Sequence, residues 1–190
     1  MFTNISGPSN QDAPAPSTPL DMLQGCHARI RHFMQLTCTL AEAEGVPHTE
    51  ITEAAAAIFR YFSQALPLHE ADENESLFPR FRDALPQGGL VREAAENMVE
   101  QHRAIDELSA ELLSLCAALR RRPEHLPTLT RRLHYVTAAL DQIFAAHLQL
   151  EECVVFPAIP QLLTPAQINQ IYSEMQHRRR PPVGAIHLVQ

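Results

Sequence analysis

Apolar residues recur at alternating intervals of three and four in four separate stretches of this 190-residue chain. The stretches cover residues 23–41, 51–73, 91–119 and 129–154. Intervals of this kind place the apolar side chains along one face of an α-helix. Because no stretch alternates with a period of two, the expected fold class is all-α. Four long amphipathic helices with short connections predict an antiparallel up-down four-helix bundle, with a short extra C-terminal helix.

Capping and turn signals set the expected boundaries. Thr18 before a proline predicts the start of the first helix, and Gly45 predicts its stop after about Glu44. Pro67 interrupts the second stretch, which predicts a kink, a loop or a helix restart there. Thr164 opens a second capping pattern. The predicted order is a disordered N-terminal tail (residues 1–18), the bundle (19–160), the short helix (161–178) and a second tail (179–190).

Charge and cysteine usage restrict the expected partners and compartment. The net charge is −7 with neutral histidines, and all 15 basic residues are arginine. Nucleic-acid-binding domains are usually strongly basic, so no nucleic-acid partner is expected. No apolar run approaches the roughly 20 residues that a spanning helix needs, and no signal peptide is recognisable, so no membrane partner is expected. The four cysteines form no C-x-x-C pair or disulfide framework, which favours a cytoplasmic protein with reduced thiols.

Histidine is unusually frequent, with ten residues, and one histidine falls on the apolar stripe of each predicted long helix. On the second and fourth helices a glutamate follows four residues later, one turn along the same helix face. The six candidate metal ligands are therefore His27, His69, Glu73, His102, His147 and Glu151. Imidazole and carboxylate together suit iron, manganese or zinc.

An internal repeat relates the two halves of this set. His27 precedes His69 by 42 residues, and His102 precedes His147 by 45. Both His-x-x-x-Glu segments continue to an apolar residue, phenylalanine and proline at identical offsets. Two copies of a helix pair would build a pseudo-twofold site of four histidines and two glutamates. Burying two carboxylates is costly unless they are paired or bind metal, and neither a lysine nor an inward-facing arginine is predicted near them.

These motifs resemble the hemerythrin-like, or HHE cation-binding, domain family over roughly residues 20–160. The resemblance rests on the two lone histidines and on the two His-x-x-x-Glu segments with their Leu-Phe-Pro and Val-Phe-Pro continuations. It implies a non-haem di-iron centre in which Glu73 and Glu151 bridge two iron ions, the four histidines are terminal ligands and an oxo or hydroxo bridge completes the core. Oxygen-carrying hemerythrins look like five histidines with two carboxylates, but here a methionine and an aspartate stand one turn from His102.

The expected function is binding or reaction of O₂, NO or peroxide at such a centre, in sensing, scavenging or iron handling. A second hypothesis is a structural or partner-binding bundle stabilised by a metal such as zinc, without redox chemistry. Zinc and manganese are also the less favoured occupants of the proposed di-iron site. A third is turnover as an enzyme, such as a peroxidase or NO reductase, which the sequence leaves undecided. Ferritin-like sites use Glu-x-x-His, which is the reverse order, and the zinc-protease motif His-Glu-x-x-His does not occur in the sequence.

Overall fold

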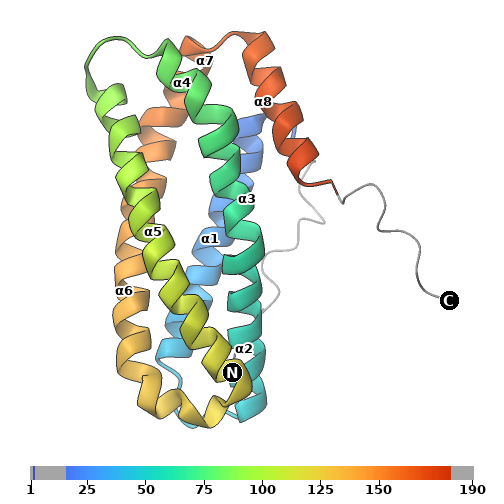
Figure 1. Ribbon diagram of the computed structural model, residues 1–190, viewed down its shortest axis with the longest axis vertical. Coiled ribbons are helices and arrows are strands. Elements are labelled where there is room, and N and C mark those ends of the chain that lie inside the picture. The colour runs from blue at the N-terminus through green and yellow to red at the C-terminus, as the bar shows by residue number, and fades with distance from the viewer. Residues whose placement is uncertain (1, 3–15, 181–190) are drawn as a thin grey trace, which may run out of the picture.

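The computed structural model describes residue 2 and residues 16–180, and every regular element in that part of the chain is a helix. This confirms the all-α class. The long helices lie side by side along the long axis of the molecule (Figure 1). α1 packs against α2 and α6, and α5 packs against the same two helices.

The elements follow one another closely along the chain. In order they are α1 (Pro19–Ala41), α2 (His48–Arg60), η1 (Tyr61–Ala65), α3 (Leu66–Ala71), η2 (Asp72–Leu77), α4 (Phe78–Ala84), α5 (Leu90–Arg121), η3 (Pro123–His125), α6 (Leu126–Leu150), η4 (Glu151–Val155), α7 (Phe156–Leu162) and α8 (Pro165–Arg178). The segments η1, η2 and η4 are π-helical and join the α-helices on either side without a break, whereas η3 is a 3₁₀ turn.

The predicted helix starts at Thr18 and Thr164 are confirmed. The Thr18 hydroxyl accepts a hydrogen bond from the Asp21 backbone N–H at 3.1 Å, and the Asp21 carboxylate accepts one from the Thr18 N–H at 2.9 Å. Thr164 and Gln167 form the same reciprocal box at the start of α8. Each box satisfies two helix-terminal N–H groups that would otherwise lack a partner.

Several boundaries differ from the predicted ones. α1 ends at Ala41 instead of Glu44, because Gly45, with a φ of 64°, lies within the connection to α2 instead of capping the last helical turn. Arg179, predicted to open a tail, is the C-cap of α8. Phe2, within the other predicted tail, is buried against the core. The remainder of the N-terminal tail before residue 16, and the segment after residue 180, lie outside the described residues.

Two apolar clusters fill the interior, one on either side of a polar layer. Along α5, Met98 belongs to one cluster and Ile105 to the other, with buried His102 between them. α1 shows the same arrangement around His27. The repeated interruption of an apolar stripe by one polar residue therefore places all the interrupting side chains at one level of the bundle.

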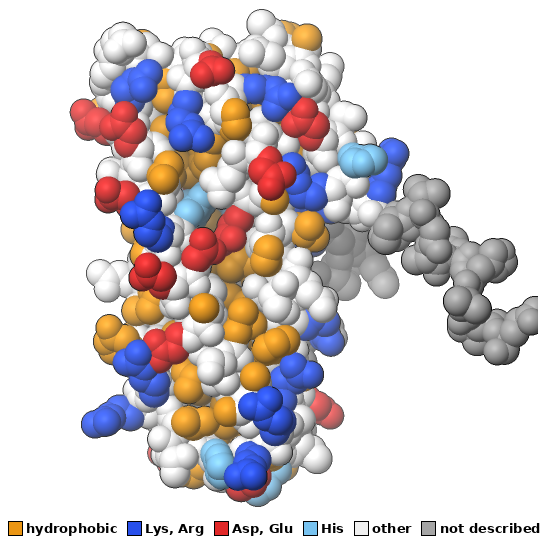
Figure 2. All heavy atoms as spheres, viewed as in Figure 1, with side chains coloured by type: hydrophobic (Ala, Val, Ile, Leu, Met, Phe, Trp, Pro, Cys, Tyr) orange, Lys and Arg blue, Asp and Glu red, His pale blue; other side chains and the backbone are white. Residues whose placement is uncertain are grey.

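Within the part of the chain that the structure describes, one helical stretch, Pro123–Leu162, is long and apolar enough by length and composition to cross a membrane, with a mean hydropathy of 1.2. Core helices of soluble proteins meet the same criteria, so the stretch is weak support for a membrane span. Its inner face carries His147 and Glu151, which are both buried. On the face seen in Figure 2, acidic and arginine side chains are interspersed with apolar ones.

Candidate metal centre

Four α-helices and two π-helical segments bring all six predicted ligand residues together. They are His27 (α1), His69 (α3), Glu73 (η2), His102 (α5), His147 (α6) and Glu151 (η4). Each is buried, with at most 6% of its surface exposed. Their ligand atoms form two groups within which all lie within 4.8 Å of one another: His27, His69, Glu73 and Glu151, and Glu73, His102 and His147.

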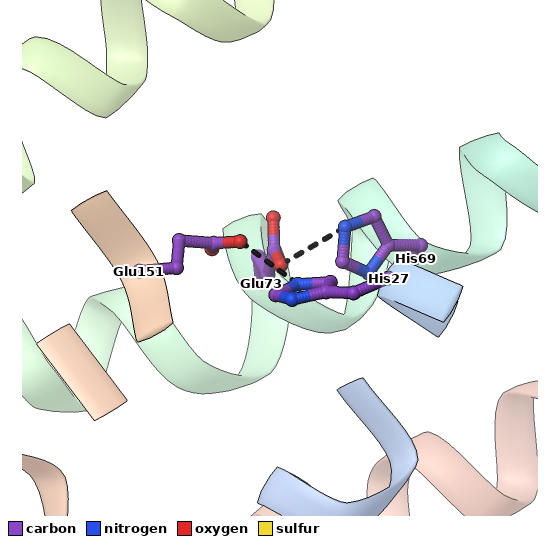
Figure 3. A group of neighbouring side chains, drawn as sticks. All are labelled: His27, His69, Glu73 and Glu151. Carbon is purple, nitrogen blue, oxygen red and sulfur yellow. Dashed lines mark ion pairs between the residues drawn. The ribbon is translucent and has the colours of Figure 1, made fainter. Parts of the chain in front are cut away.

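The first group is drawn in Figure 3, where the two imidazoles and the two carboxylates point toward one another. Glu73 Oε1 lies 3.2 Å from His69 Nε2, and its Oε2 lies 3.1 Å from His102 Nε2. Glu151 Oε2 lies 2.9 Å from His27 Nε2 and 3.7 Å from His147 Nε2. Each carboxylate therefore faces one histidine from each half of the repeat.

In three of the histidines the outer ring nitrogen, Nδ1, faces away from the centre and makes a hydrogen bond. These bonds fix the orientation and the tautomer of each ring. The carboxylate of Glu152 can only accept, so His27 Nδ1 carries a proton and donates it at 2.8 Å. The Nδ1 atoms of His102 and His147 lie 3.2 Å and 3.1 Å from side-chain amide oxygens and donate likewise. In this tautomer the neutral ring leaves Nε2 with a free lone pair directed at the centre.

Burial keeps three of the four imidazoles neutral. Desolvation lowers the pKa of His69 to about 3 and that of His147 to about 4, and it also lowers the pKa of His102. Desolvation and the neighbouring Glu151 carboxylate raise the pKa of Glu73 well above its ordinary value. The chain therefore places neutral nitrogen donors around the Glu73 carboxyl group, which is costly to ionise without a cation.

The residues fit a bound metal. Among the described residues, all four carboxylate oxygens of Glu73 and Glu151 are buried without a hydrogen-bond partner. The Nε2 atoms of His102 and His147 lie 3.3 Å apart, although both bear lone pairs when Nδ1 carries the proton. Facing lone pairs repel, and a cation that both nitrogens bind would remove the repulsion. Imidazole nitrogen and carboxylate oxygen are ordinary ligands of iron, manganese and zinc.

The π-helical segments have a common sequence cause. Each of η1, η2 and η4 ends one residue before an apolar–proline pair, at Pro67, Pro79 and Pro157. Proline cannot donate the helical hydrogen bond, and its ring clashes with the carbonyl four residues back. The helix accommodates each proline by forming a wider turn. In these turns the backbone N–H groups of Phe78 and Phe156 donate to the carbonyls of Glu73 and Glu151, five residues back. Pro67 therefore produces a π-turn, neither a loop nor a restart.

An ion cluster that was not predicted from the sequence lies beside the centre. Asp72, which precedes Glu73, is fully buried and its carboxylate binds Arg178 at 2.5 Å and also Arg179. Both arginines come from the end of α8, which packs on η2. Sequence periodicity assigned no arginine to the interior, and a pair separated by 106 residues leaves no local signal.

The outer hydrogen-bond partners of the histidines were also missed. Glu152 directly follows one carboxylate ligand, Asn74 follows the other, and Gln101 directly precedes His102. Partial burial works to raise the pKa of Glu152, but hydrogen bonds from His27 and Arg31 outweigh it and leave that pKa below its ordinary value. Adjacency to a ligand in both halves of the repeat was the available signal for these residues.

The fold and the buried cluster define a helical protein with a histidine–carboxylate metal site built from two related halves. The hemerythrin HHE cation binding domain matches residues 18–97 and again residues 93–180, so the chain belongs to that family. The double match agrees with the internal repeat. An uncharacterized protein from Haemophilus influenzae (strain ATCC 51907 / DSM 11121 / KW20 / Rd) is 28% identical over 109 residues, which is 54% of this chain and 61% of that protein. The match thus spans less than two thirds of the relative's length.

The metal-free protein should be most stable at about pH 6, and its stability should fall at both lower and higher pH. Below this pH the unfolded chain protonates histidines that stay neutral in the fold, namely His69, His102 and His147, so acidification favours unfolding. Above it, burial holds protons on Glu73 and on Glu70, whose pKa it raises to about 8. The unfolded chain has released those protons, so rising pH also favours unfolding. Thermal melts between about pH 4.5 and 8.5 test this, and a melting temperature that changes in only one direction would contradict it.

Proposed function

We propose that the chain is a non-haem di-iron protein of hemerythrin type that binds or reacts with O₂, NO or peroxide. In this proposal an antiparallel up-down four-helix bundle holds two iron ions. Glu73 and Glu151 bridge them, one ion takes His27 and His69, and an oxo or hydroxo bridge completes the core. His102 and His147 bind the other ion. We place the protein in the cytoplasm, where it serves in sensing, scavenging or iron handling.

One observation carries the choice of two ions over one. The two oxygens of Glu73 face histidines of different pairs, His69 at 3.2 Å and His102 at 3.1 Å. A carboxylate that binds a single ion presents its oxygens to one ligand set, whereas one that faces two sets is placed to bridge. Glu151 reaches both pairs through a single oxygen, because its Oε2 lies 2.9 Å from His27 Nε2 and 3.7 Å from His147 Nε2.

The chain's own residues supply binding, orientation and a dry environment. Three outer hydrogen bonds hold the rings of His27, His102 and His147 with Nε2 toward the centre. The apolar clusters above and below the polar layer keep bulk water from the centre. Bound iron would supply an open coordination position and a change of oxidation state, which is the chemistry that small oxidants require.

Anaerobic reconstitution with ferrous iron tests the proposal. We expect two iron ions per chain by metal analysis, and an absorption spectrum that changes when O₂, NO or peroxide is added. The zinc-loaded protein is the control, because zinc has no redox chemistry. A chain that takes up no iron would overturn the proposal.

The same experiment separates the alternative functions. Zinc or manganese that raises the melting temperature, together with iron that gives no spectral response to any of the three reagents, would support a structural role for the metal. Steady consumption of NO or peroxide in the presence of a reductant would show turnover by an enzyme, in place of simple binding.

A further inference from the structure

The repeat brings the residue after each carboxylate ligand against a histidine of the other half. Glu152 accepts a hydrogen bond from His27 Nδ1 at 2.8 Å. Asn74 occupies the equivalent position and accepts one from His102 Nδ1 at 3.2 Å. The two halves thus place a carboxylate behind one histidine and a neutral amide behind its counterpart.

The second histidine of each pair shows a further difference. His147 Nδ1 donates to the Gln101 amide oxygen at 3.1 Å. The repeat equivalent of Gln101 is Cys26, which is buried. Among the described residues, His69 Nδ1 is buried without a hydrogen-bond partner. One histidine pair is therefore supported by a single carboxylate, and the other by two amides.

This difference changes the donor strength of the inner nitrogens. A carboxylate bonded to the outer nitrogen of a ligating histidine raises the basicity of the ring. An amide oxygen carries no net charge and does so less. A more basic ligand favours the metal ion in its higher charge state, so the nitrogen of His27 favours ferric over ferrous iron more strongly than that of His102 does.

Arg31 holds the carboxylate without cancelling its effect. It donates to both oxygens of Glu152 at 2.9 Å. The Arg31 side chain is 53% exposed, whereas that of His27 is 1% exposed. Glu152 is itself 33% exposed, but its contact with His27 is partly buried, so water screens the charge of Arg31 more than it screens that contact.

We propose that the two metal positions are unequal, with the ferric state retained at His27/His69 and the first electron accepted at His102/His147. The inference rests on the di-iron function proposed above. One electron from dithionite, which is oxidised, would reduce one ferric ion at the second position and leave the other ion ferric. Glu152 is then a positioning residue that acts through His27.

Isosteric exchange of the two outer partners tests this. In a redox titration of the iron-loaded protein, Glu152→Gln should weaken the preference for ferric iron about tenfold at the first position. That change raises the second reduction potential by about 59 mV and leaves the first nearly unchanged. Asn74→Asp should lower the first potential by a similar amount. Glu100→Gln removes an exposed charge near the second pair without touching an outer nitrogen, and it serves as the control.

Mössbauer spectra of the one-electron-reduced protein supply a second readout. We expect separate ferric and ferrous signals in the unchanged protein, and an averaged pair or an exchanged assignment in the Glu152→Gln/Asn74→Asp double variant. Equal shifts of both potentials in every variant, or a shift of the first potential in Glu152→Gln, would overturn the inference.

Cobalt(II) titration keeps this inference distinct from the proposed function. If iron does not load, the di-iron proposal fails, but two cobalt affinities can still be measured by absorption. We expect Glu152→Gln to weaken one of them about tenfold and to leave the other unchanged. Cobalt affinities that Glu152→Gln and Asn74→Asp leave unaltered would overturn the inequality of the two positions.

Discussion

Replacing Glu73 with glutamine should reduce metal loading from two ions per chain to at most one. The Glu73 oxygens lie 3.2 Å from His69 Nε2 and 3.1 Å from His102 Nε2, so this one side chain faces both histidine pairs. An amide has a similar shape but no charge, and it offers one oxygen where the carboxylate offers two. Metal analysis after reconstitution and removal of excess metal gives the stoichiometry.

Folding and binding can be separated in this experiment. Both Glu73 oxygens are buried without hydrogen bonds among the described residues, so the neutral amide should not lower the melting temperature of the metal-free protein through a lost partner. Glu151→Gln is the matched variant in the other half, and Glu100→Gln is the exposed control. Two ions retained by Glu73→Gln would show that this residue does not bridge.

The intrahelical part of the centre could be predicted from the sequence. His69 and Glu73 lie one turn apart on an apolar stripe, and His147 and Glu151 repeat the pattern, so each pair had to face the interior. The lone His27 and the lone His102 followed from the same stripes. Helical periodicity decides these positions because it depends only on spacing along one helix.

Contacts between different helices could not be predicted from periodicity. Glu152 follows an inward-facing residue, so helical periodicity predicts that its side chain points about 100° away from the centre. In the structure it nevertheless contacts His27 on the neighbouring helix. Its position depends on which helices pack together and on their relative rotation. The π-turns were also unforeseen, because periodicity assumes 3.6 residues per turn and a wider turn at η2 or η4 re-aims every later side chain.

The family resemblance, and not the spacing of residues, identified the class of protein. The residues alone indicated a buried histidine–carboxylate cluster, and the match over residues 18–97 and 93–180 establishes the hemerythrin HHE family. Even so, family membership leaves the two halves formally equivalent. The side chains that follow the carboxylate ligands, Glu152 in one half and Asn74 in the other, distinguish them.

Replacing Asp72 with asparagine should destabilise the protein by about 3–5 kcal/mol, which is the usual result of removing one partner from a buried ion pair. Asp72 is fully buried, and its loss would remove the buried carboxylate that binds Arg178 and Arg179 at the contact between α8 and η2, leaving Arg178 with the exposed Glu75. For a chain of this size the melting temperature should fall by roughly 6–20 °C. Thermal unfolding of the metal-free protein measures the effect without contributions from bound metal.

The neighbouring Glu75 provides the matched control. It also pairs with Arg178, at 3.1 Å, but its side chain is 67% exposed. Exposed pairs contribute about 0–1 kcal/mol, so Glu75→Gln should shift the melting temperature by only a few degrees. Similar losses in both variants would show that burial of Asp72 does not distinguish the two contacts. A much larger loss for Asp72→Asn would show that α8 stabilises η2, the segment that begins one residue before Glu73, through this one carboxylate.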